Sequence, residues 1–114
     1  MTQFRYVTYY IVLALSLILP VKTYADDKQQ SINNLGQLNG IALHCKYLAL
    51  GQQIKQALVD NLPKERMLGE LFDNSTNESF LEFIKQGSSC PAESAFTIQV
   101  NEAISTLEKA YNKQ

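Results

Sequence analysis

The chain is poor in the residues that most active sites and metal sites need. Among its 114 residues it has no tryptophan, one histidine, His44, and two cysteines, Cys45 and Cys90. This set is too small for a zinc site, and the sequence has no phosphate-binding loop or haem motif. Neighbours in a helix do not face each other, so His44 and Cys45 cannot pair as base and nucleophile. We therefore predict no catalytic residue, no metal and no cofactor.

The chain also lacks an excess of positive charge. It has 11 acidic and 10 basic residues, and two of the basic ones, Arg5 and Lys22, lie in an N-terminal segment that we expect to be removed. Eight basic residues then remain, for a net charge near −3. Nucleic acids and anionic membranes both bind basic surfaces. We therefore exclude nucleic acid as the partner and expect another protein.

The longest hydrophobic run lies near the N-terminus and is too short to span a membrane. It is densest at Ile11–Leu19, follows a weakly basic start at Arg5, and ends at Pro20. A spanning helix needs about 20 apolar residues. Thr23–Ala25 then resembles a signal-peptidase site. We predict that residues 1–25 are a cleaved signal peptide and that the product is periplasmic, without stable membrane insertion. Secretion into the medium and an uncleaved anchor are the alternatives.

The two cysteines predict one disulfide. In an oxidising compartment an even number of cysteines indicates pairing, and two permit only the Cys45–Cys90 bridge. A metal site and a free catalytic thiol are the competing interpretations. Residues 26–30 are polar and predict a loose N-terminal tail, and residues 31–114 are short enough for one domain.

The first half of that domain has helical spacing interrupted by glycines. Between residues 31 and 61, apolar residues recur at steps of three and four, as they do on one face of a helix. Each glycine costs a helix about 1 kcal/mol relative to alanine. We therefore predict a short helix followed by a longer one over residues 40–60. The G-x-x-x-G spacing of Gly36 and Gly40 indicates either a bend or a close helix crossing.

The second half predicts two or three further helices. Pro63 suits the first turn of a helix that ends at Asp73–Ser75, and the S-x-x-E pattern from Ser75 to Glu78 predicts a capped new helix ending at Gly87. Pro91 then opens the last helix. Its apolar stripe is Phe96, Val100, Ala103, Leu107 and Tyr111, with Ile104 beside it. The predicted fold is all-α, a small bundle of four or five helices closed by one disulfide.

Two polar features are candidate sites. Asp73, Asn74 and Asn77 lie in the predicted polar loop between two short helices, and we predict that they contact a partner; an ordinary helix–helix turn is the alternative. Glu78 and Glu82 share a helix face, where paired carboxylates can do acid–base chemistry. A solvated helix face is the favoured interpretation of this pair.

Two segments resemble a known family. Cys45–Gly51 (C-K-Y-L-A-L-G) and Cys90–Gln114, where C-P leads into a helix with Gln99 and Val100, resemble the periplasmic immunity proteins that neutralise amidase effectors of type VI secretion. Those proteins are small, exported, helical and disulfide-bonded. The tyrosine spacing and the longer stretch between the cysteines depart from their pattern. The resemblance implies inhibition by tight binding, with a loop or helix that blocks an enzyme's cleft.

The signal peptide, the mature length and the single bridge are also similar to those of the HdeA-like acid-stress chaperones, whereas Cys45–Leu48 departs from their first cysteine motif. That resemblance implies partial unfolding at low pH and exposure of apolar surface. A secretion-system assembly adaptor is a third interpretation. We therefore expect a non-catalytic exported protein that binds another protein in the periplasm as an inhibitor, with the chaperone and the adaptor as alternatives.

Overall fold

Four helices make up the part of the chain that the structure describes. The structure is a computed structural model that describes residues 24–112. Its helices are α2 (Tyr24–Cys45), α3 (Leu48–Asn61), α4 (Arg66–Gln86) and α5 (Glu93–Asn112), and this range contains no strand. The predicted all-α bundle is therefore confirmed. The predicted signal peptide lies outside the described residues except for its last two, which begin α2.

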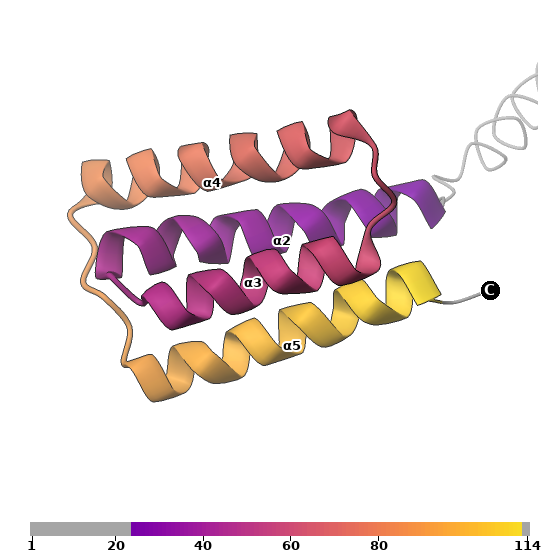
Figure 1. The fold of residues 1–114 in the computed structure, drawn as a ribbon. Helices are drawn as coiled ribbons and strands as arrows, with labels where there is room; N and C mark the ends of the chain where they lie inside the picture. The colour runs from indigo at the N-terminus through magenta and orange to yellow at the C-terminus, as the bar shows by residue number, and fades with distance from the viewer. Residues whose placement is uncertain (1–23, 113–114) are drawn as a thin grey trace, which may run out of the picture.

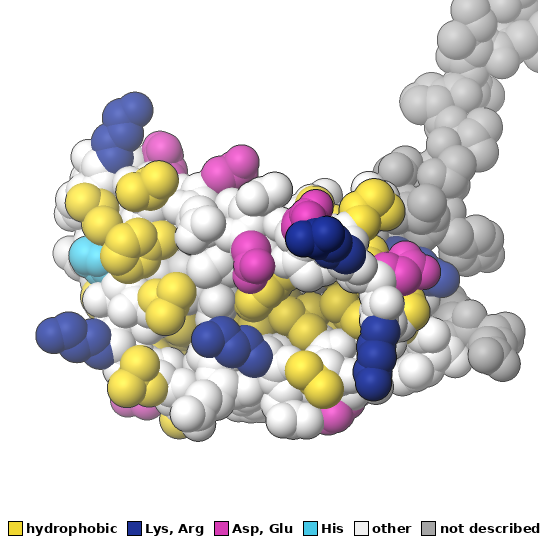
Figure 2. Space-filling model, turned by 45° about the horizontal axis from the view of Figure 1, so that its top comes forward, with side chains coloured by type: hydrophobic (Ala, Val, Ile, Leu, Met, Phe, Trp, Pro, Cys, Tyr) yellow, Lys and Arg dark blue, Asp and Glu magenta, His cyan; other side chains and the backbone are white. Residues whose placement is uncertain are grey.

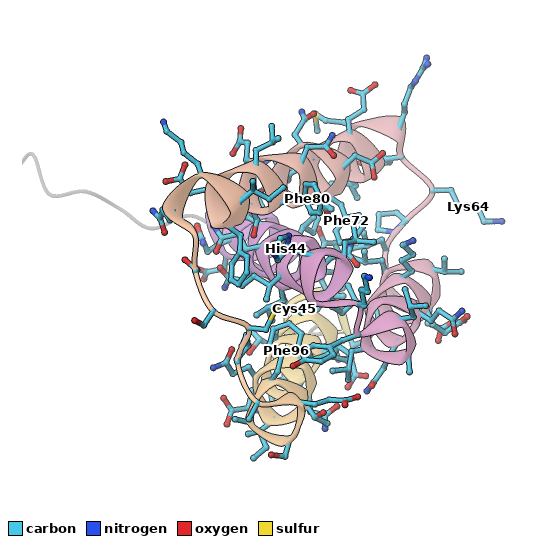
Figure 3. The ribbon with its side chains drawn as sticks, turned by 90° about the vertical axis from the view of Figure 1, so that its left-hand side faces the viewer. His44, Cys45, Lys64, Phe72, Phe80 and Phe96 are labelled. Atoms are coloured by element: carbon cyan, nitrogen blue, oxygen red, sulfur yellow. A yellow bond between two sulfur atoms is a disulfide. The ribbon has the colours of Figure 1, made fainter. Side chains whose placement is uncertain are left out.

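Helix α2 is the central element of the bundle. It packs against each of the other three helices, and α3 also packs against α5 (Figure 1). Among the described helices, α4 packs on α2 alone, on the side of α2 away from α5 (Figure 3). The rest of its surface therefore has no neighbouring helix within the described range.

The core forms where α2, α3 and α5 meet, and α4 extends it on the other side of α2. Phe96 is fully buried on the α5 side of α2, whereas Phe72 of α4 lies on the opposite side (Figure 3). The predicted stripe of the last helix is confirmed: Phe96, Val100 and Leu107 are buried, and Ala103, Ile104 and Tyr111 pack against the core. Burial of such side chains contributes about 1.5–3 kcal/mol each.

The predicted division of the first half of the domain is wrong. Residues 26–30 are helical rather than a loose tail, and α2 continues through Gly36 and Gly40. The break comes at Lys46, whose φ of 61° is left-handed. The backbone N–H of Tyr47 donates to the Ala42 carbonyl over 2.8 Å, as in a Schellman motif. A glycine usually occupies this position, so the lysine gave no sequence signal for the break.

The predicted break at Asp73–Ser75 is also wrong, because α4 is a single helix across this segment. The two prolines lie before the helices and not in their first turns as predicted: Pro63 lies three residues before α4, and Pro91 lies two before α5. The predicted stop at Gly87 is confirmed. Its φ is 62°, and its N–H donates to the carbonyls of Ile84 and Phe83 at the end of α4.

A close crossing of α2 and α4 explains why the helix breaks predicted at the α2 glycines and at Asp73–Ser75 are absent. We call it the α2–α4 seam and define it by Gly36, Gly40, Ser75, Thr76 and Ser79. A Cβ atom on Gly36 would lie 2.5 Å from the Ser75 Cβ, and one on Gly40 would lie 2.6 Å from the Thr76 carbonyl oxygen. The two glycines are therefore contact positions, not helix breaks, which confirms the second interpretation of the G-x-x-x-G spacing.

Polar groups in the seam are paired across the two helices. Ser75 Oγ lies 2.7 Å from Asn33 Oδ1, to which it donates, and Ser79 Oγ donates to the Gln37 carbonyl over 2.6 Å. The buried Asn39 Nδ2 donates to Thr76 Oγ1 over 3.2 Å. Serine and threonine can compete with a helix's own backbone hydrogen bonds. Here their hydroxyl groups join α4 to α2 instead.

Candidate functional site

The structure places the predicted partner-binding residues on a helix instead of a loop. Asp73, Asn74 and Asn77 all lie within α4, and their side chains are exposed. Ser75 and Thr76 between them are buried in the α2–α4 seam. The prediction of a projecting loop is therefore wrong. Contact of the three exposed side chains with a partner stays a prediction.

The predicted disulfide is confirmed, and it holds one end of the bundle together. Cys45 ends α2, and its sulfur is bonded to that of Cys90 in the loop before α5, with the Cα atoms 5.7 Å apart. A second tether lies beside it, where the Tyr47 hydroxyl donates to the Pro91 carbonyl over 2.6 Å. The Tyr47 ring also packs on Phe96, with ring centres 5.7 Å apart. The loop between α4 and α5 is thus fixed to the end of α2.

Apolar side chains collect at this same end of the molecule. We define the end patch by its five residues, Leu43, His44, Leu48, Phe80 and Ile84. Leu48 is 68% exposed, Ile84 49% and Leu43 44%. Figure 2 shows yellow apolar side chains gathered near the cyan histidine on this face. The patch draws on the ends of α2 and α4 and the start of α3, so it depends on the tertiary fold.

His44 lies among aromatic rings of α4. Its imidazole centre is 5.9 Å from the ring centre of Phe80 in an edge arrangement, and 4.9 Å from that of Phe83. Figure 3 shows His44 of α2 between its own helix and α4, near the labelled Phe80. Such contacts fix ring positions, and each aromatic pair contributes about 0.5–1.5 kcal/mol. The histidine thus joins the α2 and α4 parts of the end patch.

A small pocket lies beside the end patch, between α2 and α3. We call it the α2–α3 pocket; its volume is about 180 Å³. Its lining residues come from the end of α2, the turn and the start of α3: Asn39, Ala42, Leu43, Tyr47, Leu48, Gly51, Gln52 and Lys55. Asn39 is 2% exposed, and its Oδ1 has no hydrogen-bond partner among the described residues. A Cβ atom on Gly51 would lie 3.4 Å from this oxygen.

An open groove of about 960 Å³ runs along α2 and α4, and it is lined by both polar and apolar side chains. Glu78 and Glu82 lie in its α4 wall, and both are exposed. Glu82 Oε1 accepts a hydrogen bond of 2.7 Å from Gln86 Nε2. Both carboxylates therefore lie on a solvent-exposed face of α4. Within residues 24–112, no group of three or more His, Cys, Asp and Glu side chains is placed to hold a metal ion.

The other end of the bundle carries the one shifted ionisable group that the described residues show. Burial raises the pKa of the Tyr111 phenol above its ordinary value of 10.0, and the negative charge of Glu65 adds to the shift. Lys28 Nζ lies 5.2 Å from the centre of the Tyr111 ring. The Tyr111 ring therefore packs against the end of the core and contacts this cation, which indicates a structural role.

Sequence reasoning missed the end patch, although one signal for it was present. The segment Phe80–Ile84 has four apolar residues in five positions, more than one helix face can bury. The surplus had to be exposed or covered by something else.

No helix of the described range is long and apolar enough to cross a membrane. Comparison of the chain with protein-family models, curated proteins and solved structures finds no match.

Proposed function

We propose that this chain is a non-catalytic protein that binds another protein through the end patch. The observation that carries the proposal is the gathering of exposed leucine and isoleucine side chains around aromatic rings at one end of the bundle. Contiguous exposed apolar surface is costly in water and marks interaction sites. Aromatic anchors within such a surface are typical of binding hot spots.

The rigidity of this end supports an inhibitor over a chaperone. The Cys45–Cys90 bridge and the Tyr47–Pro91 hydrogen bond hold the elements that frame the patch. A surface that is already ordered loses less entropy on binding, which favours tight one-to-one association. An acid-stress chaperone would instead expose its apolar surface by unfolding. Here the apolar surface is exposed on the folded chain, so we favour the immunity or inhibitor function.

The proposed place of action is the periplasm. One sequence feature and one structural feature support export, namely the predicted signal peptide over residues 1–25 and the disulfide, since such bonds persist in oxidising compartments. In that compartment the partner would be another exported protein, such as an enzyme delivered by a competitor.

A matched pair of isoleucine variants tests the proposal. The oxidised protein is used as bait in periplasmic extract at neutral pH, and bound proteins are identified by mass spectrometry. Ile84→Glu places a charge in the end patch, whereas Ile98→Glu changes an isoleucine of α5 that is 60% exposed and lies outside it. We expect one stoichiometric partner on the wild type and on Ile98→Glu, and its loss on Ile84→Glu. Equal retention by both variants would refute binding through the end patch.

An acid arm separates the alternatives. The same capture is repeated at low pH, together with a circular dichroism spectrum of the bait. Many clients on a partly unfolded bait at acid pH, with none at neutral pH, would favour the chaperone and contradict the inhibitor. A neutral-pH partner that is itself a secretion-system component would favour the adaptor.

A further inference from the structure

The α2–α3 pocket contains an unpaired hydrogen-bond acceptor. Asn39 Nδ2 is used in the α2–α4 seam, but Asn39 Oδ1 has no partner within the described residues and is shielded from solvent. Buried polar atoms are rarely left unpaired, because each keeps the full penalty for losing its water. This oxygen lies beside the side-chain-free Gly51, where an added Cβ atom would be 3.4 Å away, and both residues line the pocket.

The size and walls of the pocket define what could satisfy this oxygen. A volume of about 180 Å³ is far more than one water needs, and apolar cavities of about 150 Å³ admit a benzene ring. Ala42, Leu43 and Leu48 supply apolar walls. A matching group is therefore one aromatic ring that carries a hydrogen-bond donor.

The charge at the rim selects a neutral donor. Lys55 lines the pocket, and its ammonium group disfavours entry of a second cation such as an arginine or lysine side chain. The same cation attracts the face of an aromatic ring. Of the common donors, the phenol of tyrosine combines a single ring, a neutral charge and one O–H.

We propose that the α2–α3 pocket receives one tyrosine side chain of the protein partner, whose hydroxyl donates to Asn39 Oδ1. This inference rests on the proposed protein-binding function and names the anchor of that contact. Asn39 Oδ1 is covered in the free chain, so the hydroxyl reaches it only after residues that line the pocket move; Leu48 and Gln52 are two exposed lining residues. Tyrosine anchors of this kind are typical of interface hot spots.

The test uses p-cresol, the side-chain analogue of tyrosine, and toluene, the same molecule without its hydroxyl. Each is titrated into the full oxidised protein labelled with ¹⁵N, and amide shifts are followed by NMR. We expect p-cresol to shift the Asn39 side-chain amide and the Leu48 and Gly51 backbone amides. Toluene should bind about five- to tenfold more weakly, because it leaves the acceptor unpaired.

Two glycine variants provide the control. In Gly51→Ala the new methyl group lies at contact distance from Asn39 Oδ1 without a clash, so the fold should persist while p-cresol binding is lost. In Gly69→Ala the new methyl group meets nothing within 4 Å, and binding should be unchanged. Should Gly51→Ala unfold, Leu48→Lys, at a wall residue that is 68% exposed, serves instead.

Each outcome decides the inference. Absence of p-cresol shifts at Asn39, Leu48 and Gly51 overturns the pocket, and equal affinity for toluene overturns the role of the Asn39 oxygen. Because no partner protein is present, failure here leaves protein binding through the end patch intact. Failure of the Ile84→Glu capture experiment, with p-cresol still bound, would instead refute the end patch and keep the pocket.

Discussion

Replacing Gly40 by alanine should destabilise the fold, although alanine is the better helix former. Within an isolated helix the change would stabilise by about 1 kcal/mol. In the folded chain, the new Cβ would lie 2.6 Å from the Thr76 carbonyl oxygen and 2.8 Å from the Phe80 backbone nitrogen. Both are backbone atoms of α4, so a side-chain rotation cannot relieve the contact. Helix α4 must move away from α2.

The size of the effect follows from what that movement disrupts. Restoring ordinary contact distances requires a shift of about 1 Å, and overpacking of this kind costs about 1–3 kcal/mol. The hydrogen bonds from Ser75, Ser79 and Asn39 across the seam would lengthen at the same time. Each contributes about 0.5–1.5 kcal/mol. After the gain in helix propensity, we expect a net loss of about 2 kcal/mol in the free energy of unfolding.

Urea unfolding followed by far-ultraviolet circular dichroism measures this loss. A protein of this size has an m-value of about 1 kcal/mol per molar urea, so the midpoint should fall by about 2 M. Gly69→Ala is the control, because its methyl group meets nothing within 4 Å. It should raise stability by about 1 kcal/mol. If Gly40→Ala proves as stable as Gly69→Ala, the close crossing of α2 and α4 is refuted.

Three further predictions concern caps, covalent closure and pH. Lys46→Gly should stabilise, and Gly87→Ala destabilise, by about 1 kcal/mol each, since both positions have left-handed φ angles; melting temperatures that shift in the same direction in the two variants would contradict this. The double variant Cys45→Ser, Cys90→Ser should lose up to about 4 kcal/mol in urea unfolding, because the bridge closes a long loop, and an unchanged midpoint would argue against a structural role. The pKa of Tyr111 is raised in the folded chain, so this tyrosine ionises at a lower pH in the unfolded chain. The stability that the neutral tyrosine contributes is therefore complete below pH 10.0 and is lost as the pH rises above it. Tyr111→Phe should flatten the fall in stability measured by urea titration across that range, and an identical fall in the variant would exclude this tyrosine as the cause.

The features that periodicity or pairing determines could be predicted from the sequence. The stripe Phe96–Tyr111 repeats at helical spacing along one helix, so its burial followed from the pattern. The disulfide followed because two cysteines allow one internal pair. The stop at Gly87 followed because a left-handed C-cap favours glycine.

The helix breaks could not be predicted, because the same residues have two possible roles. Gly36 and Gly40 weaken an isolated helix but also allow another helix to approach closely. Serine residues end many helices, but here the Ser75 hydroxyl donates a hydrogen bond to Asn33 on the neighbouring helix. Only the tertiary contact decides between these roles. The end patch was missed for a related reason, since its residues come from three helices that are adjacent only after folding.

The position of the disulfide determines how the folded chain would respond to mechanical force. Both α3 and α4 lie between Cys45 and Cys90, whereas α2 and α5 lie outside that interval. Tension applied at the two ends of the chain would pass through the sulfur–sulfur bond and bypass α3 and α4. With a sequence separation of 45, the bridge conceals about 150 Å of extensible chain. Only a reducing agent would make that length available, so the oxidised protein would be a shorter tether than its sequence implies.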